Sequence, residues 1–121
     1  MSLAPLTPPL RVACIGAGYF SRFHYGSWAR MESARAVTSC NRDIAKARAT
    51  GLPAYGDPAQ MLAEVQSDLL DIILPPEAHA QTIRLALAAG VKRMICQKPF
   101  CRTLEEARQI TEEAEAEGAV I

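Results

Sequence analysis

Residues 11–24 place a short apolar run, a glycine turn and a helix start in direct succession, and this order constrains the fold most. The apolar run at residues 12–15 is typical of a strand buried on both faces. Gly16 allows a sharp turn, and Gly18 lets backbone N–H groups approach a diphosphate without an intervening Cβ. The helix N-terminus that follows favours negative charge. Ser21 replaces the third glycine of a G-x-G-x-x-G fingerprint, so this stretch alone also fits an ordinary strand–helix turn.

Strand and helix patterns alternate along the remaining chain. Further strands are expected at residues 34–40, 53–55, 69–74 and 91–96, and residues 119–121 resemble the opening of a sixth. Helices are expected at residues 19–31, 45–50, 59–65, 76–89 and 103–117, with N-caps at Asp43, Asp57 and Thr103. In the first helix, the expected packing residues are Phe20, Phe23, Trp28 and Met31. The alternation predicts an α/β fold: a doubly wound parallel sheet of about six strands with helices on both faces.

Residues 1–9 are rich in proline and show no periodicity, so they are expected to form an extended or disordered leader. Residues 10–121 then form one domain of a size that buries a single core. The 13 basic and 13 acidic side chains cancel, which argues against a nucleic-acid or anionic-membrane partner. No apolar run reaches the roughly 18 residues of a membrane span, and no signal peptide is evident. A cytoplasmic location is expected.

The sequence predicts no metal site, because it holds no CxxC pair and its two histidines, His24 and His79, are far apart. Cys14, Cys40 and Cys96 fall in or beside predicted strands, where free cysteines act as small buried hydrophobes.

Ligands of doubly wound sheets bind outside the carboxyl ends of the strands, where the strand order reverses. The residues that follow the predicted strands are therefore expected to line one crevice: residues 16–20, 41–42, 74–79 and 97–99. His24 is expected to be a packed, hydrogen-bonded histidine. For His79, a place at the crevice rim and a structural role both remain open.

Four segments in register resemble a known family. They are GAGYFSRFH at residues 16–24, CNRD at 40–43, LPPEAH at 74–79 and QKP at 97–99. Their order and spacing are similar to those of the glucose–fructose oxidoreductase, inositol dehydrogenase and MocA (Gfo/Idh/MocA) group of NAD(P)-dependent oxidoreductases. The resemblance covers residues 10–121 and implies a Rossmann-type dinucleotide-binding domain.

The resemblance also implies roles for individual residues. Gly16, Gly18, Tyr19 and Phe20 would line the diphosphate turn, while Leu74, Pro75, Pro76 and His79 would border the nicotinamide side. Gln97 stands where the family has a carboxylate, and its amide can still bind a ribose hydroxyl. Lys98 would assist hydride transfer, and its peptide bond to Pro99 is a candidate cis bond. A solvated lysine at a strand end is the alternative for Lys98.

Asn41 and Arg42 bear on the choice of cofactor. An acidic residue at this strand end would accept hydrogen bonds from the adenosine ribose of NAD, but position 41 holds no carboxylate. Arg42 is suited to a 2′-phosphate. The expected cofactor is therefore NADP or NAD.

The family implies a second, largely β domain that supplies the substrate pocket, and this chain is expected to lack it. The predicted function is thus the N-terminal cofactor domain of an oxidoreductase acting on the CH–OH group of a sugar, inositol or related polyol. The alternatives are a non-catalytic nucleotide-binding or sensor module, or a truncated product without activity. A homo-oligomer is also considered, because the family pairs through the sheet that this chain is expected to lack; an exposed strand edge at residues 119–121 would instead invite aggregation or swapped pairing.

Overall fold

The computed structural model describes residues 3–121. Met1 and Ser2, the first residues of the expected leader, lie outside the described residues. Residues 3–9 contain neither helix nor strand, and the Arg93 guanidinium donates a hydrogen bond to the carbonyl oxygen of Ala4. None of the helices in residues 3–121 has both the length and the apolar character that a membrane span requires.

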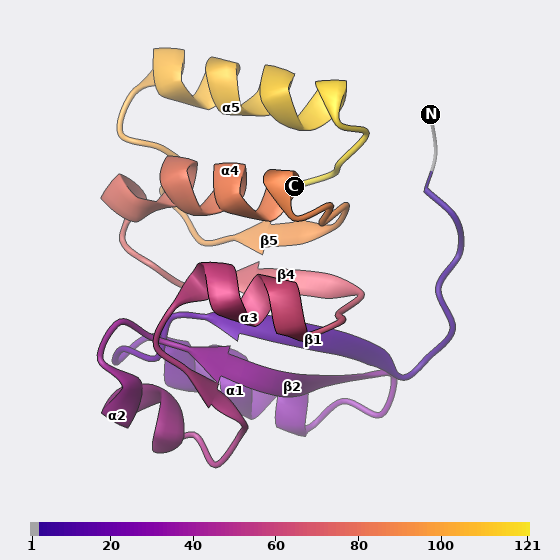
Figure 1. The fold of residues 1–121 in the computed structure, drawn as a ribbon, viewed down its shortest axis with the longest axis vertical. Helices are drawn as coiled ribbons and strands as arrows, with labels where there is room; N and C mark the ends of the chain where they lie inside the picture. The colour runs from indigo at the N-terminus through magenta and orange to yellow at the C-terminus, as the bar shows by residue number, and fades with distance from the viewer. Residues whose placement is uncertain (1–2) are drawn as a thin grey trace.

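Five parallel strands form one sheet in the order β3-β2-β1-β4-β5 (Figure 1). Their bounds are β1 Leu10–Ile15, β2 Ala34–Cys40, β3 Ala54–Tyr55, β4 Leu69–Ile72 and β5 Met94–Cys96. The predicted parallel sheet is confirmed, with five strands rather than six. At the position of the sixth, Val120 makes only an isolated parallel bridge with Arg93.

Helices connect successive strands, and their side-chain caps explain where three of them begin. Their bounds are α1 Ser21–Ala29, α2 Ile44–Arg48, α3 Pro58–Glu64, α4 His79–Ala88 and α5 Leu104–Ala116, with a 3₁₀ turn, η1, at Pro76–Ala78. The side chains of Asp43, Asp57 and Thr103 accept hydrogen bonds from the backbone N–H groups at the starts of α2, α3 and α5. All three predicted N-caps are confirmed.

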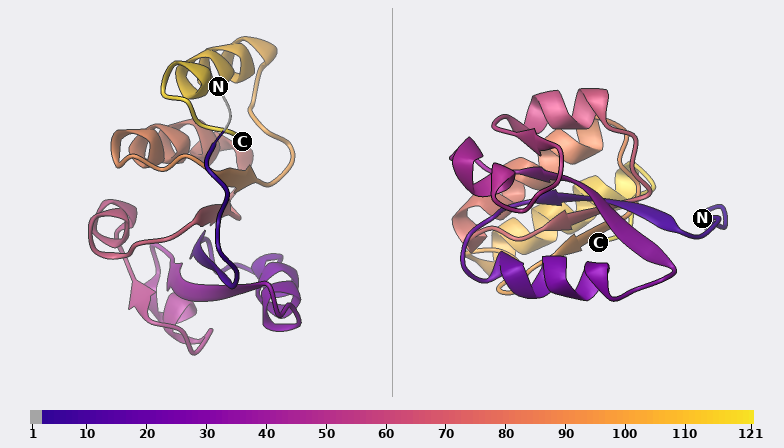
Figure 2. Two further views of the ribbon diagram at one scale, coloured as in Figure 1. Left: turned by 90° about the vertical axis from the view of Figure 1, so that its right-hand side faces the viewer. Right: turned by 90° about the horizontal axis from the view of Figure 1, so that it is seen from below.

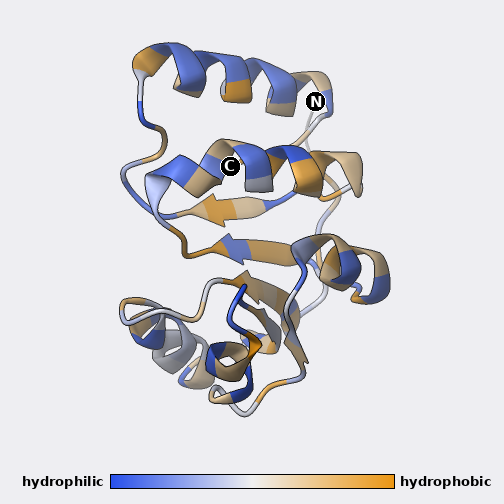
Figure 3. Ribbon diagram, turned by 60° about the vertical axis from the view of Figure 1, so that its left-hand side comes forward, coloured by the Kyte–Doolittle hydropathy of each residue, from blue (hydrophilic) through white to orange (hydrophobic). Residues whose placement is uncertain are grey.

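The helices cover both faces of the sheet (Figure 2). α3, α4 and α5 pack on one face over the larger core, which includes Ile15, Met61, Ile72, Ile83 and Ile110. α1 packs on the other face, where Tyr25 and Trp28 contact a smaller buried cluster that contains Val12 and Cys14. Hydrophobic colour is concentrated on the strands, whereas much of α5 is hydrophilic (Figure 3).

The expected packing of α1 is wrong in part. Phe20 and Phe23 are about half exposed, and Met31, which follows the helix, is exposed as well. Only Trp28 of the four expected residues packs against the sheet. The helix is shorter than predicted, and the face that it turns to the sheet carries Ser21, Tyr25 and Trp28, four and three residues apart.

The strand order fixes where a ligand can bind. β1 lies between β2 and β4, so the chain progresses in one direction from β1 to β3 and then returns across the sheet to β4. The carboxyl ends of β1 and β4 flank this switch point, at the left of Figure 1. Doubly wound sheets bind their ligands there.

Candidate functional site

The turn after β1 requires glycine at its first position. Gly16 has φ +115°, and a Cβ built on it would lie 2.0 Å from the carbonyl oxygen of Ile73, which directly follows β4. Its backbone N–H donates to the carbonyl oxygen of Cys40 (2.7 Å), and Ile73 donates to Ile15 (2.8 Å). Gly16 therefore sits where the ends of β1, β2 and β4 come closest together.

Gly18 differs, because a Cβ added there would meet no heavy atom within 4 Å. Its backbone carbonyl accepts hydrogen bonds from the Ser21 hydroxyl (2.5 Å) and the Ser21 N–H (3.2 Å). Ser21 is itself buried. The serine that departs from the glycine fingerprint thus closes the turn with its own side chain, and α1 begins at that residue.

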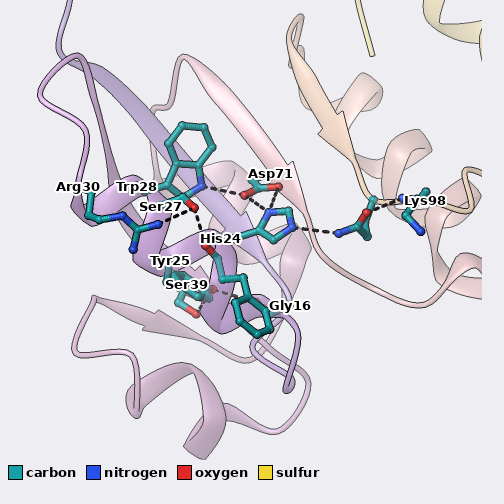
Figure 4. Close-up of polar contacts among 11 residues, drawn as sticks. Gly16, His24, Tyr25, Ser27, Trp28, Arg30, Ser39, Asp71 and Lys98 are labelled. Atoms are coloured by element: carbon teal, nitrogen blue, oxygen red, sulfur yellow. Dashed lines mark hydrogen bonds and ion pairs between the residues drawn. The ribbon is translucent and has the colours of Figure 1, made fainter.

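Tyr25 braces the glycine turn from α1, a role that the sequence reasoning missed. Its hydroxyl donates to the Gly16 carbonyl oxygen (2.9 Å) and lies 2.7 Å from the Ser39 hydroxyl. Burial raises the pKa of the Tyr25 phenol, so this group stays protonated. Figure 4 shows Gly16, Tyr25 and Ser39 together at the carboxyl ends of β1 and β2.

A cleft of about 390 Å³ opens between the glycine turn and the loops that follow β4 and β5. It is lined by Gly18, Tyr19, Phe20, Ser21, Ile73, Leu74, Pro75, Pro76, Gln97 and Lys98. Eight of these residues are among the predicted site residues, Ser21 and Ile73 being the exceptions. A larger groove of about 650 Å³ lies between β5, α5 and residues 119–121, and it contains none of the predicted site residues.

Asn41 and Arg42 lie next to the glycine turn but outside the lining of the 390 Å³ cleft. The Asn41 side-chain oxygen accepts a hydrogen bond from the Ala17 N–H (3.0 Å), and its amide donates to the Asp43 carbonyl oxygen (3.0 Å). Asn41 thereby joins the end of β2 to the turn. The Arg42 side chain is exposed at the same edge of the sheet.

His79 lies behind the cleft with no exposed surface. Its Nδ1 is 2.8 Å from the carbonyl oxygen of Phe100, and its Nε2 is 2.7 Å from that of Leu74. Of the two roles left open by the sequence, this burial favours the structural one. His79 connects the loops after β4 and β5, and so holds two walls of the cleft together.

Asp71 is a buried carboxylate in the middle of β4, and the sequence reasoning overlooked it. It accepts hydrogen bonds from the His24 ring (2.9 Å) and the Trp28 indole (2.8 Å), both on α1. His24 is thus the hydrogen-bonded histidine that was expected. A carboxylate inside an otherwise apolar strand must find buried donors, and that signal in LLDIIL could have revealed it.

The peptide bond between Lys98 and Pro99 is cis. Lys98 itself is exposed on the cleft wall, directly after Gln97. Within residues 3–121, no three His, Cys, Asp or Glu side chains gather as a metal site would require. The absence of a bound metal stays a prediction.

A family model described as "Oxidoreductase family, NAD-binding Rossmann fold", that of the Gfo/Idh/MocA proteins, matches residues 10–121. The chain belongs to this family.

Gfo/Idh/MocA relatives with assigned activities include two sugar dehydrogenases. The chain is 39% identical over 111 residues to D-apiose dehydrogenase of Paraburkholderia graminis, which covers 88% of this chain and 29% of that protein. It is 30% identical to D-glucoside 3-dehydrogenase of Escherichia coli, over 100% of this chain and 36% of that protein. The chain therefore spans about a third of the length of the curated relatives that it matches.

Solved structures agree with this assignment. An oxidoreductase from Agrobacterium radiobacter, crystallised with NAD+, L-tartaric acid and magnesium, superposes with a TM-score of 0.86 at 28% identity. The match covers 92% of this chain and 34% of that one. The Rossmann-type fold that the resemblance implied is confirmed.

Proposed function

We propose that this chain is the cofactor-binding part of an oxidoreductase that transfers a hydride between a nicotinamide dinucleotide and a CH–OH carbon. The observation that carries this proposal is that Lys98 and the glycine turn line one cleft at the switch point of the sheet. A phosphate-binding turn and a cation in one cleft suit an anionic cofactor beside a hydroxyl-bearing substrate.

Different residues of the chain would contact different parts of the cofactor. The backbone of Gly18, Tyr19 and Phe20, together with the N-terminus of α1, would bind the diphosphate. Leu74, Pro75 and Pro76 would form the wall on the nicotinamide side. When bound, the nicotinamide ring supplies the hydride acceptor or donor.

Lys98 would act on the substrate oxygen. Its exposed ammonium group lies on the wall of the cleft, and as a three-proton donor it can orient a carbinol or carbonyl oxygen. It would also stabilise negative charge that develops on that oxygen during hydride transfer. We assign Lys98 the role of catalytic residue.

The names of the relatives support the substrate class. D-apiose dehydrogenase and D-glucoside 3-dehydrogenase are named for sugar substrates, and both are about three times as long as the matched region. A sugar, inositol or related polyol is therefore the proposed substrate. Residues of the substrate pocket would come from the part of the relatives that this chain does not span.

Arg42 makes the cofactor preference testable. Its exposed guanidinium at the end of β2 would pair with the 2′-phosphate of NADP, whereas the Asn41 side chain is occupied by Ala17 and Asp43. NADP is therefore at least as well suited to this edge as NAD.

Calorimetric titration of the purified chain with NADPH and NADH tests the proposal. We expect measurable binding of both, and Arg42→Ala should weaken NADPH about fivefold or more, because a charge-assisted hydrogen bond is lost, while NADH changes less. Arg35→Ala is the matched control: it also removes one exposed arginine, but at the start of β2, next to Ala34, rather than just beyond the end of that strand. Binding of neither nucleotide would overturn the cofactor role. Equal effects of Arg42→Ala on both nucleotides would remove Arg42 from the 2′-phosphate site.

A further inference from the structure

A continuous chain of hydrogen bonds runs from the interior of the sheet to the backbone of Lys98 (Figure 4). It begins at Asp71, whose side chain is completely buried on the α1 face of β4. Within residues 3–121, the carboxylate of Asp71 is paired with no lysine or arginine. Its hydrogen bonds come from the Trp28 indole (2.8 Å) and from His24 Nδ1 (2.9 and 3.1 Å to the two carboxylate oxygens).

The Lys98 end of this series of hydrogen bonds fixes the direction of every bond in it. The backbone N–H of Lys98 can only donate, and it lies 2.8 Å from the side-chain oxygen of Gln97. The Gln97 amide nitrogen therefore faces the other way, toward Nε2 of His24 at 3.1 Å. Because that amide nitrogen can only donate, Nε2 must accept, and the ring proton of a neutral His24 must lie on Nδ1.

The two ends agree, since a proton on Nδ1 is also what the buried carboxylate of Asp71 needs. A carboxylate that fixes the tautomer and orientation of an imidazole is a recurrent arrangement behind functional groups in proteins. Here the imidazole in turn orients Gln97, and Gln97 holds the Lys98 backbone. Every buried polar side-chain atom in residues 3–121 has a hydrogen-bond partner, and this includes the buried atoms of Asp71, His24 and Gln97.

We infer that Asp71 is a positioning residue: through the tautomer of His24 and the orientation of Gln97, it fixes the backbone of Lys98 at the cleft wall. The catalytic value of this placement rests on the proposed function of Lys98. The placement itself can be measured on the chain alone.

The oxygen Oδ2 of Asp71 lies 2.9 Å from His24 Nδ1 and 2.8 Å from Trp28 Nε1, so an asparagine oxygen at that position would still accept from both donors, whereas Asp71→Leu removes the acceptor. Without it, a proton on Nδ1 would be a buried donor with no partner, so the ring proton should move to Nε2, where Gln97 can accept it. Gln97 must then turn its oxygen to His24 and its nitrogen toward the Lys98 N–H. Two donors then face each other, so the hydrogen bond to Lys98 is lost.

The matched control is Trp28→Phe. It removes the other hydrogen bond to Asp71 and retains an aromatic ring, but it leaves the direction of the bonds from Asp71 to Lys98 unchanged. A role limited to stability predicts that both variants loosen the site alike. A positioning role predicts that only Asp71→Leu changes the hydrogen bond of the Lys98 N–H.

The measurement is ¹⁵N NMR of the His24 ring and of the Lys98 amide in the 121-residue chain. In the wild type we expect a protonated Nδ1 and an unprotonated Nε2. In Asp71→Leu, the proton should move to Nε2, and the Lys98 amide proton should exchange with solvent about fivefold to tenfold faster. Trp28→Phe should change neither. A wild-type His24 protonated at Nε2 alone, or a folded Asp71→Leu with an unchanged Lys98 amide, overturns the inference.

Gln97→Glu keeps the inference testable if Asp71→Leu does not fold, because Gln97 lies at the cleft surface. A carboxylate there accepts from both the Lys98 N–H and His24, so both ring nitrogens should carry protons between two carboxylates. A His24 ring that stays unprotonated at Nε2 in this variant also overturns the inference. NADH titration of the same samples separates the two proposals: failure to bind NADH removes the proposed function but leaves the tautomer result intact.

Discussion

Gly16 and Gly18 are two residues apart in one turn, yet the structure gives them different reasons to be glycine. In Gly16→Ala, the new Cβ would lie 2.0 Å from the Ile73 carbonyl oxygen and 2.7 Å from its carbonyl carbon, at φ +115°. The backbone strain costs about 1–3 kcal/mol. Relief of the clash costs a further amount of about 1–3 kcal/mol, because β1 and β4 must separate.

Together these penalties are a large fraction of the roughly 6–18 kcal/mol expected for a domain of this size. Gly16→Ala should therefore lower the unfolding midpoint by at least about 8 °C. In Gly18→Ala the new Cβ meets nothing within 4 Å, so the free energy of unfolding should change by less than about 1 kcal/mol. Its Cβ would instead project where the diphosphate is proposed to bind and weaken NADH about tenfold or more.

The assay pairs thermal unfolding, followed by circular dichroism, with NADH titration of both variants. Each variant serves as the control for the other, since the two share the substitution and the turn. A Gly16→Ala midpoint within about 3 °C of the wild type would refute the close approach of Ile73. A Gly18→Ala variant that binds NADH as tightly as the wild type would refute the placement of the diphosphate.

Three further predictions concern stability and thiol chemistry. Burial raises the pKa of Cys40 to about 11 and that of Cys96 to about 12, so the native state keeps protons that the unfolded chain loses above pH 9. The contribution of these two thiols to the free energy of unfolding should therefore be constant well below pH 9. It should fall between pH 9 and 11 by up to about 1.4 kcal/mol per pH unit for each thiol, which urea denaturation over that range will show; a flat profile there contradicts it. Because only the thiolate is alkylated, iodoacetamide at pH 8 should label the less buried Cys101 before Cys40, as mass spectrometry of the native chain can establish; the reverse order contradicts the burial. Thr103→Ala removes the cap that accepts from the Glu106 N–H (3.1 Å) and should cost about 0.5–2 kcal/mol in urea denaturation, whereas Thr103→Ser should restore most of it.

The fold was predictable because its signals are local. Asp57 followed by Pro58 specifies a helix start within two residues, and the apolar run at residues 69–74 specifies a buried strand without reference to the rest of the chain. The sixth strand was an overcount, since only Val120 pairs, through a single bridge to Arg93. The side chains that line the cleft were predictable for the same reason: they follow directly from the strand ends.

The contacts of the residues behind the cleft lining, His24, Asp71 and His79, were not predictable from their spacing in the sequence. His24 and Asp71 are separated by 47 positions, and only the packing of α1 on β4 brings them to 2.9 Å. Likewise, the burial of His79 depends on the carbonyl of Phe100, 21 positions later. Phe20 and Phe23 show the limit of hydrophobicity as a guide, because both side chains are apolar yet about half exposed.

The sequence contains a single tryptophan, Trp28, and its indole donates to the carboxylate of Asp71. Its fluorescence consequently reports on one defined location, the buried end of the hydrogen-bonded chain that leads to Lys98. Reduced nicotinamide absorbs in the region where indole emits, so a dinucleotide bound in the nearby cleft would quench this emission by energy transfer. The residue that helps to satisfy a buried charge is thereby also an optical probe of the cofactor site, which requires neither a label nor an engineered reporter.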